Sequence, residues 1–436
     1  MKKALTLVAA ALCLLAASAQ HGGTAQRGQR VLAMLMTGAT DSLYAEMSAE
    51  MRQAMSKTQL SVLWYTMEMT YGKVQSTGQW EEQHVMGYDV AKCRVGFARA
   101  DLDFSVTFSG DGVAGMFFTP APEAAPPQEP VTSASFQEKH LVLSCDGYDM
   151  PALLTLPKQE AKAPCVIIVH GSGPNDKDGT IGGNKPYAQL ARMLAERGVA
   201  SFRYDKRTFV YRDLPDSIAA TLTVDYETTD DAVAAAAMLH AMADDIDTSR
   251  LFVLGHSQGG MMIPRIAQRT TAPHGYIMMA APARRLLDLM MMQLDYLHEH
   301  GLYPDWPKAR KDMERQIANL RLWGQDAFDS TMPMPMGLPL SYLLDLEGYD
   351  QTNEARTIDK PLLVLNGEAD YQVTMDDFNL WKDALQGKPN VTFKSYVGLN
   401  HIFIPAGDPP LPSDYAKQGT IPSEVADDIA RFAKGL

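Results

Sequence analysis

The feature that most constrains this chain is a serine flanked by glycines, directly after a short apolar run. Residues 250–254 (RLFVL) lead into Gly255-His256-Ser257-Gln258-Gly259, and a segment of helical character follows. This order predicts a strand, a sharp turn and a helix, with Ser257 at the apex of the turn. Glycine suits positions 255 and 259, because the turn strains the serine backbone and a larger neighbour would collide with the opposite arm. The sequence therefore predicts a serine hydroxyl at the carboxyl end of a buried strand.

A serine hydroxyl is a weak nucleophile at neutral pH and needs a base that is held by an acid. The apolar run 361–365 (PLLVL) ends in a polar turn that contains Asp370, as expected of a strand buried on both faces. A second strand-like segment, 391–397, runs into Gly398-Leu399-Asn400-His401. We therefore predict Asp370 as the acid and His401 as the base. Asp376 and Asp377 are rival acids, but they follow Val373-Thr374 and are predicted to lie inside the next helix.

A loop further upstream has the character of an oxyanion hole, the set of N–H groups that stabilises a tetrahedral intermediate. The apolar segment 165–169 opens into His170-Gly171-Ser172-Gly173, whose glycines allow the backbone to approach a substrate. One donor is expected from such a loop and one from the residue after the nucleophile. The predicted donors are the backbone N–H groups of Ser172 and Gln258.

These motifs together resemble those of a known family. Residues 136–436 are similar to an α/β-hydrolase of the serine-esterase and aminopeptidase-like group. The strings HGSGPND (170–176) and YDKR (204–207) resemble a bacterial carboxylesterase subfamily whose members carry an extra N-terminal module. The resemblance implies a mostly parallel sheet with flanking helices and a helical lid. It also implies a catalytic triad, which carries over to Ser257, Asp370 and His401, while Asp205 and Arg207 are expected to fix a loop beside the site.

The pattern along the chain predicts four parts. Residues 1–19 resemble a signal peptide, with two lysines, an apolar stretch and the small-x-small site Ala17-Ser18-Ala19. Residues 20–119 are expected to form a small α+β accessory domain, with helices over 28–71 and an antiparallel meander over 83–118. Residues 120–130 are proline-rich and predict an extended linker. Residues 131–436 alternate strands and helices, which predicts an α/β-hydrolase domain.

About eighty residues separate the strand that ends near Ala280 from the one that starts at Pro361, far more than a crossover helix needs. We predict a helical lid insertion over about 284–357. Methionines cluster in it at 290–292 and 332–336. Because methionine is flexible and polarizable, they are expected either to line an acyl pocket or to pack the lid onto the core.

Composition excludes some classes of partner. The chain has 436 residues and a net charge of -13, which argues against nucleic acid or an anionic membrane surface. No cofactor is predicted. No metal site is predicted either, since His298 and His300 are two residues apart on an expected helix and point to different faces. The three cysteines after the leader, Cys93, Cys145 and Cys165, are odd in number, and no structural disulfide is expected.

The predicted function is an exported, periplasmic or extracellular serine hydrolase that cleaves small-molecule carboxylic esters through an acyl-enzyme. No stable membrane insertion is expected after removal of the leader. A peptidase or amidase with the same triad is the competing interpretation, in which Glu299, Asp312 and Glu314 are candidates to bind a substrate amino terminus. A non-catalytic binding protein is the alternative from another class. The natural substrate, the role of the N-terminal domain and the oligomeric state are not predicted.

Overall fold

The computed structural model describes residues 23–57, 60, 64, 67, 71–85, 88–98, 100–110, 112–120, 131–160, 162–211, 218, 221–302 and 306–436. The predicted signal peptide and residues 121–130 of the predicted linker lie outside this range. The chain divides into two compact units, Met1–Gln128 and Glu129–Leu436. Within the described part, no helix is both long and apolar enough to cross a bilayer.

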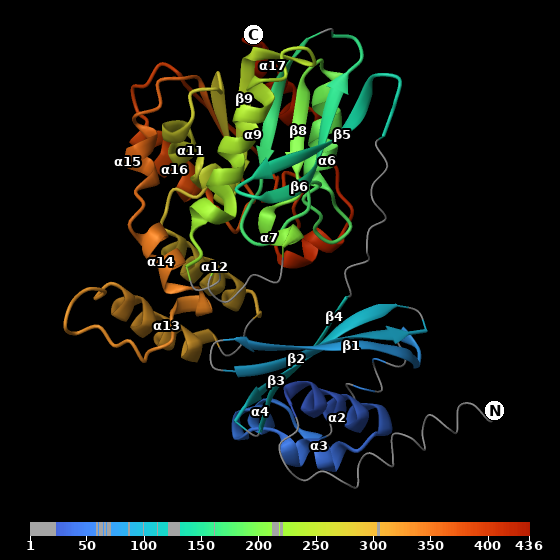
Figure 1. Cartoon of the computed structure of the whole chain (residues 1–436). Coiled ribbons are helices and arrows are strands. Elements are labelled where there is room, and N and C mark those ends of the chain that lie inside the picture. The colour runs from blue at the N-terminus through green and yellow to red at the C-terminus, as the bar shows by residue number, and fades with distance from the viewer. Residues whose placement is uncertain are drawn as a thin grey trace. The chain divides into compact units, whose positions relative to one another are not determined.

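The N-terminal unit has helices on one face of a small antiparallel sheet (Figure 1). Its helices are α2 (Thr24–Thr37), α3 (Thr40–Glu46) and α4 (Ala49–Ala54), and its strands follow the order β1 (Val74–Val85), β2 (Tyr88–Phe97), β3 (Asp101–Ser109) and β4 (Gly112–Pro120). Strand β3 alternates as the sequence predicts, with Leu102, Phe104, Val106 and Phe108 buried. The first strand begins at Val74, well before the predicted start at residue 83. The prediction missed the earlier part because this stretch is polar and bulged and shows no alternation of polar and apolar residues.

The second unit is built on an eight-stranded sheet of order β12-β11-β10-β9-β7-β8-β6-β5. Strands β7 to β12 run parallel to one another, whereas β6 pairs antiparallel with β8, and β5 pairs antiparallel with β6 at one edge. The strands are β5 (Phe136–Cys145), β6 (Tyr148–Pro157), β7 (Ala163–Val169), β8 (Ala200–Tyr204), β9 (Ile246–His256), β10 (Gly275–Met279), β11 (Leu362–Gly367) and β12 (Val391–Tyr396). Every residue of β7, β8, β10 and β11 is buried, as expected of strands covered on both faces.

Helices cover both faces of this sheet (Figure 1). Apolar side chains of α9 (Asp230–His240), α11 (Ile263–Arg269) and α16 (Met375–Ala384) fill the core on one face. Those of α6 (Pro186–Glu196) and α17 (Ser423–Lys434) fill the core on the other face. Between β10 and β11 the chain forms the predicted helical insertion. Its elements are α12 (Leu286–Glu299), α13 (Trp306–Leu320), η2 (Pro335–Gly337), α14 (Leu340–Glu347) and α15 (Gln351–Ala355).

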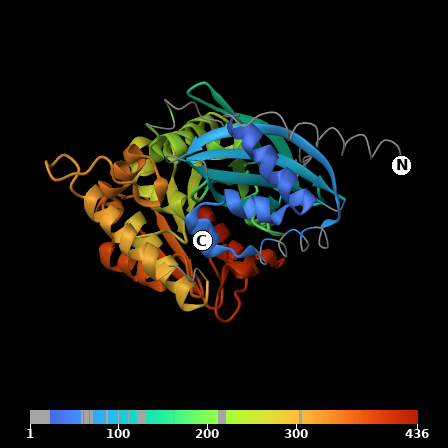
Figure 2. The ribbon, with the colours of Figure 1, turned by 90° about the horizontal axis from the view of Figure 1, so that it is seen from below.

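The inserted helices have a small apolar cluster of their own. Leu287 of α12, Ile317 and Leu320 of α13 and Leu343 of α14 are buried against one another. Helices α12 and α13 lie side by side (Figure 2). Because the insertion buries its own apolar side chains, it is a packed layer and not a loose loop.

Candidate active site

The parallel register brings four loops to the same edge of the sheet. Val169 pairs with Gly255, His256 with Met279, and Gly367 with Tyr396. The loops that follow β7, β9, β11 and β12 therefore leave the sheet at their carboxyl ends together. In open α/β sheets this edge is where ligands bind.

Ser257 occupies the predicted turn between β9 and α10 (Gln258–Met261). Its backbone has φ 54° and ψ −120°, a conformation that costs a non-glycine residue about 1–3 kcal/mol. A Cβ at Gly255 would lie 2.1 Å from the Gly259 carbonyl oxygen, and one at Gly259 would lie 2.5 Å from the His170 oxygen. The turn thus excludes any side chain at the two glycines. Ser257 itself is partly exposed, while its neighbours are buried.

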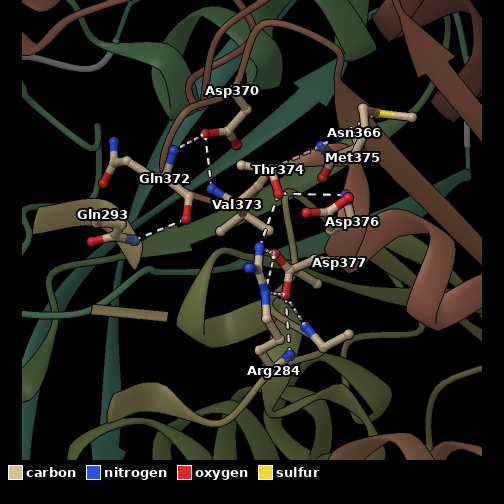
Figure 3. Close-up of polar contacts among 12 residues, drawn as sticks. Arg284, Gln293, Asn366, Asp370, Gln372, Val373, Thr374, Met375, Asp376 and Asp377 are labelled. Carbon is tan, nitrogen blue, oxygen red and sulfur yellow. Dashed lines mark hydrogen bonds and ion pairs between the residues drawn. The ribbon is translucent and has the colours of Figure 1, made fainter. Parts of the chain in front are cut away.

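Asp370 and His401 form a buried pair beyond the ends of β11 and β12. His401 Nδ1 lies 2.7 Å from Asp370 Oδ2. The other carboxylate oxygen, Oδ1, accepts hydrogen bonds from the backbone N–H groups of Gln372 at 2.8 Å and Val373 at 3.0 Å (Figure 3). Both oxygens of Asp370 are therefore occupied, and the carboxylate is held in one orientation toward the imidazole.

The rival acids are engaged elsewhere. Asp377 lies in α16 and is fully buried. Its carboxylate accepts from the N–H groups of Ala283 and Arg284 at 3.0 Å and lies 2.5 Å from the Arg284 guanidinium (Figure 3). Asp376 is exposed in the first turn of the same helix. The structure brings Asp370, and neither of these two, to His401.

A second histidine connects three of the loops. His256 Nε2 lies 2.8 Å from the His401 carbonyl oxygen, and His256 Nδ1 lies 2.9 Å from the Tyr187 hydroxyl. Burial, and secondarily the nearby His401, lower the pKa of His256 to about 3, so this ring is neutral. A carbonyl only accepts, so Nε2 carries the proton and Tyr187 donates to Nδ1. The Tyr187 oxygen in turn accepts from the Gly171 N–H at 3.3 Å.

Sequence reasoning did not single out His256 or Tyr187 in this chain of hydrogen bonds. The signal for His256 was its place inside the glycine-serine-glycine string. Tyr187 had no signal, because nothing local marks which helix residue reaches a loop.

The predicted oxyanion loop lies against the nucleophile. A Cβ at Gly171 would lie 3.2 Å from the Cβ of Ser257. Asn175 Nδ2 donates to the carbonyl oxygens of Ser172 and Gly173 at 2.9 Å, which turns these carbonyls toward the loop interior. Neither the Ser172 nor the Gln258 N–H donates a hydrogen bond to another residue of the described ranges. Asp205 accepts from the Lys177 N–H at 2.7 Å, in line with the loop-fixing role predicted for it.

A cleft of about 580 Å³ opens between α12 and α13. Met291, Met292 and Tyr296 form part of its wall, and Tyr296 stacks on Tyr371, the residue after Asp370, with ring centroids 5.4 Å apart. Gln293 donates to the Gln372 carbonyl oxygen at 2.9 Å (Figure 3). Helix α12 thus packs directly on the loop that holds Asp370.

No group of three or more His, Cys, Asp or Glu in the described part of the chain is arranged to hold a metal ion. Cys93, Cys145 and Cys165 are free thiols. Burial raises the pKa of Cys93 and of Cys145 to about 12, which leaves little thiolate at neutral pH.

The sheet order, the serine at a strained strand-to-helix turn and the Asp–His pair after later strands define an α/β-hydrolase. The chain belongs to the serine aminopeptidase S33 family, whose model matches residues 162–405. A second model, described as a protein of unknown function (DUF3887), matches residues 29–114. These matches confirm the predicted resemblance, the fold class and the presence of an N-terminal module.

Esterase EstD of Thermotoga maritima is 33% identical over 387 residues, which is 88% of this chain and 89% of the relative. Among solved structures, Est1E from Butyrivibrio proteoclasticus has 16% identity and a TM-score of 0.43, covering 68% of this chain and 99% of its own. An esterase from Pyrococcus furiosus has 15% identity and a TM-score of 0.44, covering 73% and 99%.

Proposed function

We propose that this protein is an exported serine hydrolase that cleaves carboxylic esters through a Ser257-His401-Asp370 triad. The observation that carries the proposal is the buried Asp370–His401 pair, at the same sheet edge as the strained Ser257 turn. The 33% identity to an esterase over most of both chains supports the ester as substrate. Export is supported by the leader pattern of residues 1–19.

In the proposed reaction the Ser257 oxygen attacks the ester carbonyl carbon while its proton passes to His401 Nε2. Asp370, bonded to Nδ1–H, holds the imidazole in the correct tautomer and stabilises the imidazolium that forms. The N–H groups of Ser172 and Gln258 stabilise the negative charge on the carbonyl oxygen. His401 then gives the proton to the leaving alcohol, and water repeats the two steps to release the acid and free Ser257.

The surroundings of the three acids that could bind a substrate amino terminus favour esterase over aminopeptidase chemistry. Glu314 pairs with Arg310, and Asp312 pairs with Arg315. Arg310 also pairs with Asp295 of α12, so both Glu314 and Asp312 are already engaged with an arginine. This leaves Glu299, an exposed residue at the end of α12. One exposed carboxylate is a weak anchor for an ammonium group.

Active-site labelling followed by a substrate panel tests the proposal. The wild-type protein should react with a fluorophosphonate at Ser257 and hydrolyse p-nitrophenyl acyl esters much faster than aminoacyl p-nitroanilides. Unchanged labelling of Ser257→Ala would reassign the nucleophile, and faster cleavage of the anilides would make the enzyme an aminopeptidase. The intact mass of the exported protein should correspond to a chain that begins at Gln20.

Two methionines of the insertion separate the acyl-pocket and packing interpretations. Met292 lines the cleft, whereas Met334 packs on the apolar cluster of the insertion. Met292→Ala should change the ratio of kcat/KM between short and long acyl chains by roughly 10-fold, because each fitted methylene contributes about 1–3 kcal/mol. Met334→Ala should leave that ratio unchanged and lower the free energy of unfolding by about 1–3 kcal/mol. Equal effects of the two variants on the ratio would contradict an acyl site in the cleft.

A further inference from the structure

Lys206 is a buried ammonium group beside the oxyanion loop. It lies between β8 and α7 (Arg207–Val210), in the YDKR string, and is 1% exposed. Its Nζ donates to the Gly171 carbonyl oxygen at 2.8 Å, to Glu227 Oε1 at 2.8 Å and to Gln258 Oε1 at 3.3 Å. An ammonium has three N–H groups, so every donor of Lys206 has an acceptor.

The bond to Gly171 determines the direction of the next N–H group. The Gly171 C=O and the Ser172 N–H belong to one planar trans peptide unit and point in opposite directions. With its oxygen drawn toward buried Lys206, this unit turns the Ser172 N–H away from Lys206. Asn175 Nδ2 lies 3.4 Å from the same oxygen and bonds the next two carbonyls, so it supports the same orientation.

Lys206 also belongs to a closed ring of four buried side chains. Gln258 Nε2 donates to the Tyr342 hydroxyl, which donates to Glu227 Oε2 at 2.6 Å, and Glu227 and Gln258 both accept from Lys206. Burial, together with Glu227, raises the pKa of Tyr342, so its hydroxyl stays protonated and can donate. Glu227 comes from η1 (Asp225–Thr229) and Tyr342 from α14 of the insertion. The ring therefore joins Gln258 to the inserted helices, and Lys206 extends this connection to the Gly171–Ser172 peptide unit.

We propose that Lys206 is a positioning residue that orients the oxyanion hole. It holds the Gly171–Ser172 peptide unit and the Gln258 side chain in register with Ser257. The proposal rests on the proposed function, because it assumes that the Ser172 N–H receives the oxyanion. A buried lysine–glutamate pair adds little net stability, since desolvation offsets the attraction. What this pair supplies is a fixed direction for its hydrogen bonds.

Thionoesters, in which sulfur replaces the carbonyl oxygen, provide a direct readout. Sulfur is a weak hydrogen-bond acceptor, so a thionoester gains little from the oxyanion donors. Lys206→Met should lower kcat/KM for an aryl ester by about 10- to 100-fold, a part of the loss seen when an oxyanion donor is removed outright. The matching thionoester should lose much less, so the ester-to-thionoester ratio should fall by about 10-fold.

Lys177→Met is the matched control. Lys177 lies in the loop after β7, as Gly171 does. Its Nζ pairs with Asp205 at 3.1 Å, but it bonds neither Gly171 nor Gln258. Its ester-to-thionoester ratio should stay at the wild-type value. If Lys206→Met does not fold because Glu227 is left as an unpaired buried charge, the double variant Lys206→Met/Glu227→Gln removes both charges and should show the same fall in the ratio.

Two outcomes would overturn the proposal. One is an equal loss on ester and thionoester, which indicates a merely structural role. The other is an unchanged ratio with full activity in a folded Lys206 variant. Failure of the proposed function itself would look different, because the wild-type protein would then hydrolyse no ester or Ser257→Ala would retain activity.

Discussion

Ser257→Ala is expected to lower kcat/KM for ester hydrolysis on the order of 10⁴-fold or more, because the variant lacks the attacking oxygen. His401→Ala should lose activity to a similar extent, since serine without its base remains a neutral hydroxyl. The double variant should be no worse than either single variant, because the two residues act as a unit. Steady-state rates on a p-nitrophenyl ester measure all three.

Matched controls show whether such losses belong to the site. Ser201 lies in β8, fully buried, and Ser201→Ala removes a serine hydroxyl away from the turn. His240 is exposed at the end of α9, and His240→Ala removes an imidazole outside the site. Both controls should retain near wild-type rates. A Ser257→Ala protein that keeps most of its activity would show that another residue is the nucleophile.

The sequence predicted the turn and the Asp–His contact because each residue follows a recognisable strand: Ser257 and Asp370 come after the buried ends of β9 and β11, and His401 comes after β12, an edge strand with alternating burial. Buried parallel strands appear in a sequence as short apolar runs, and the first polar residues after them mark the edge where side chains converge. Gly255 and Gly259 were predicted on steric grounds, and their close contacts with backbone oxygens agree with that reason. The local pattern alone also favoured Asp370 over Asp377, by placing the latter inside a helix.

The ring around Lys206 was not predictable in the same way. Its members come from the turn after β8, from η1, from α10 and from α14, and only the fold brings them together. A buried ion pair leaves no local pattern, because each charged residue alone has the sequence appearance of a surface residue. Strand β1 was placed too late for a related reason, since its bulged and polar residues show no alternation of burial.

Asp370→Asn is expected to lower kcat by about 10³- to 10⁴-fold with little effect on the fold. Oδ1 accepts two backbone N–H groups, from Gln372 and Val373, and an amide NH₂ cannot replace it there. The asparagine oxygen must therefore stay on that side, and the NH₂ group faces His401 Nδ1. Nδ1 then becomes the acceptor, the proton moves to Nε2, and His401 can no longer accept the proton of Ser257. Rates on a p-nitrophenyl ester, with thermal unfolding measured in parallel, test this expectation.

Asp377→Asn is the control with the opposite signature. It weakens the ion pair with Arg284 and the two backbone hydrogen bonds from residues 283 and 284, so the melting temperature should fall. Its kcat should remain within a few-fold of the wild-type value, because Asp377 does not contact His401. If Asp370→Asn were fully active and Asp377→Asn inactive but folded, the acid would be Asp377, and the hydrogen bond between Asp370 and His401 would be structural.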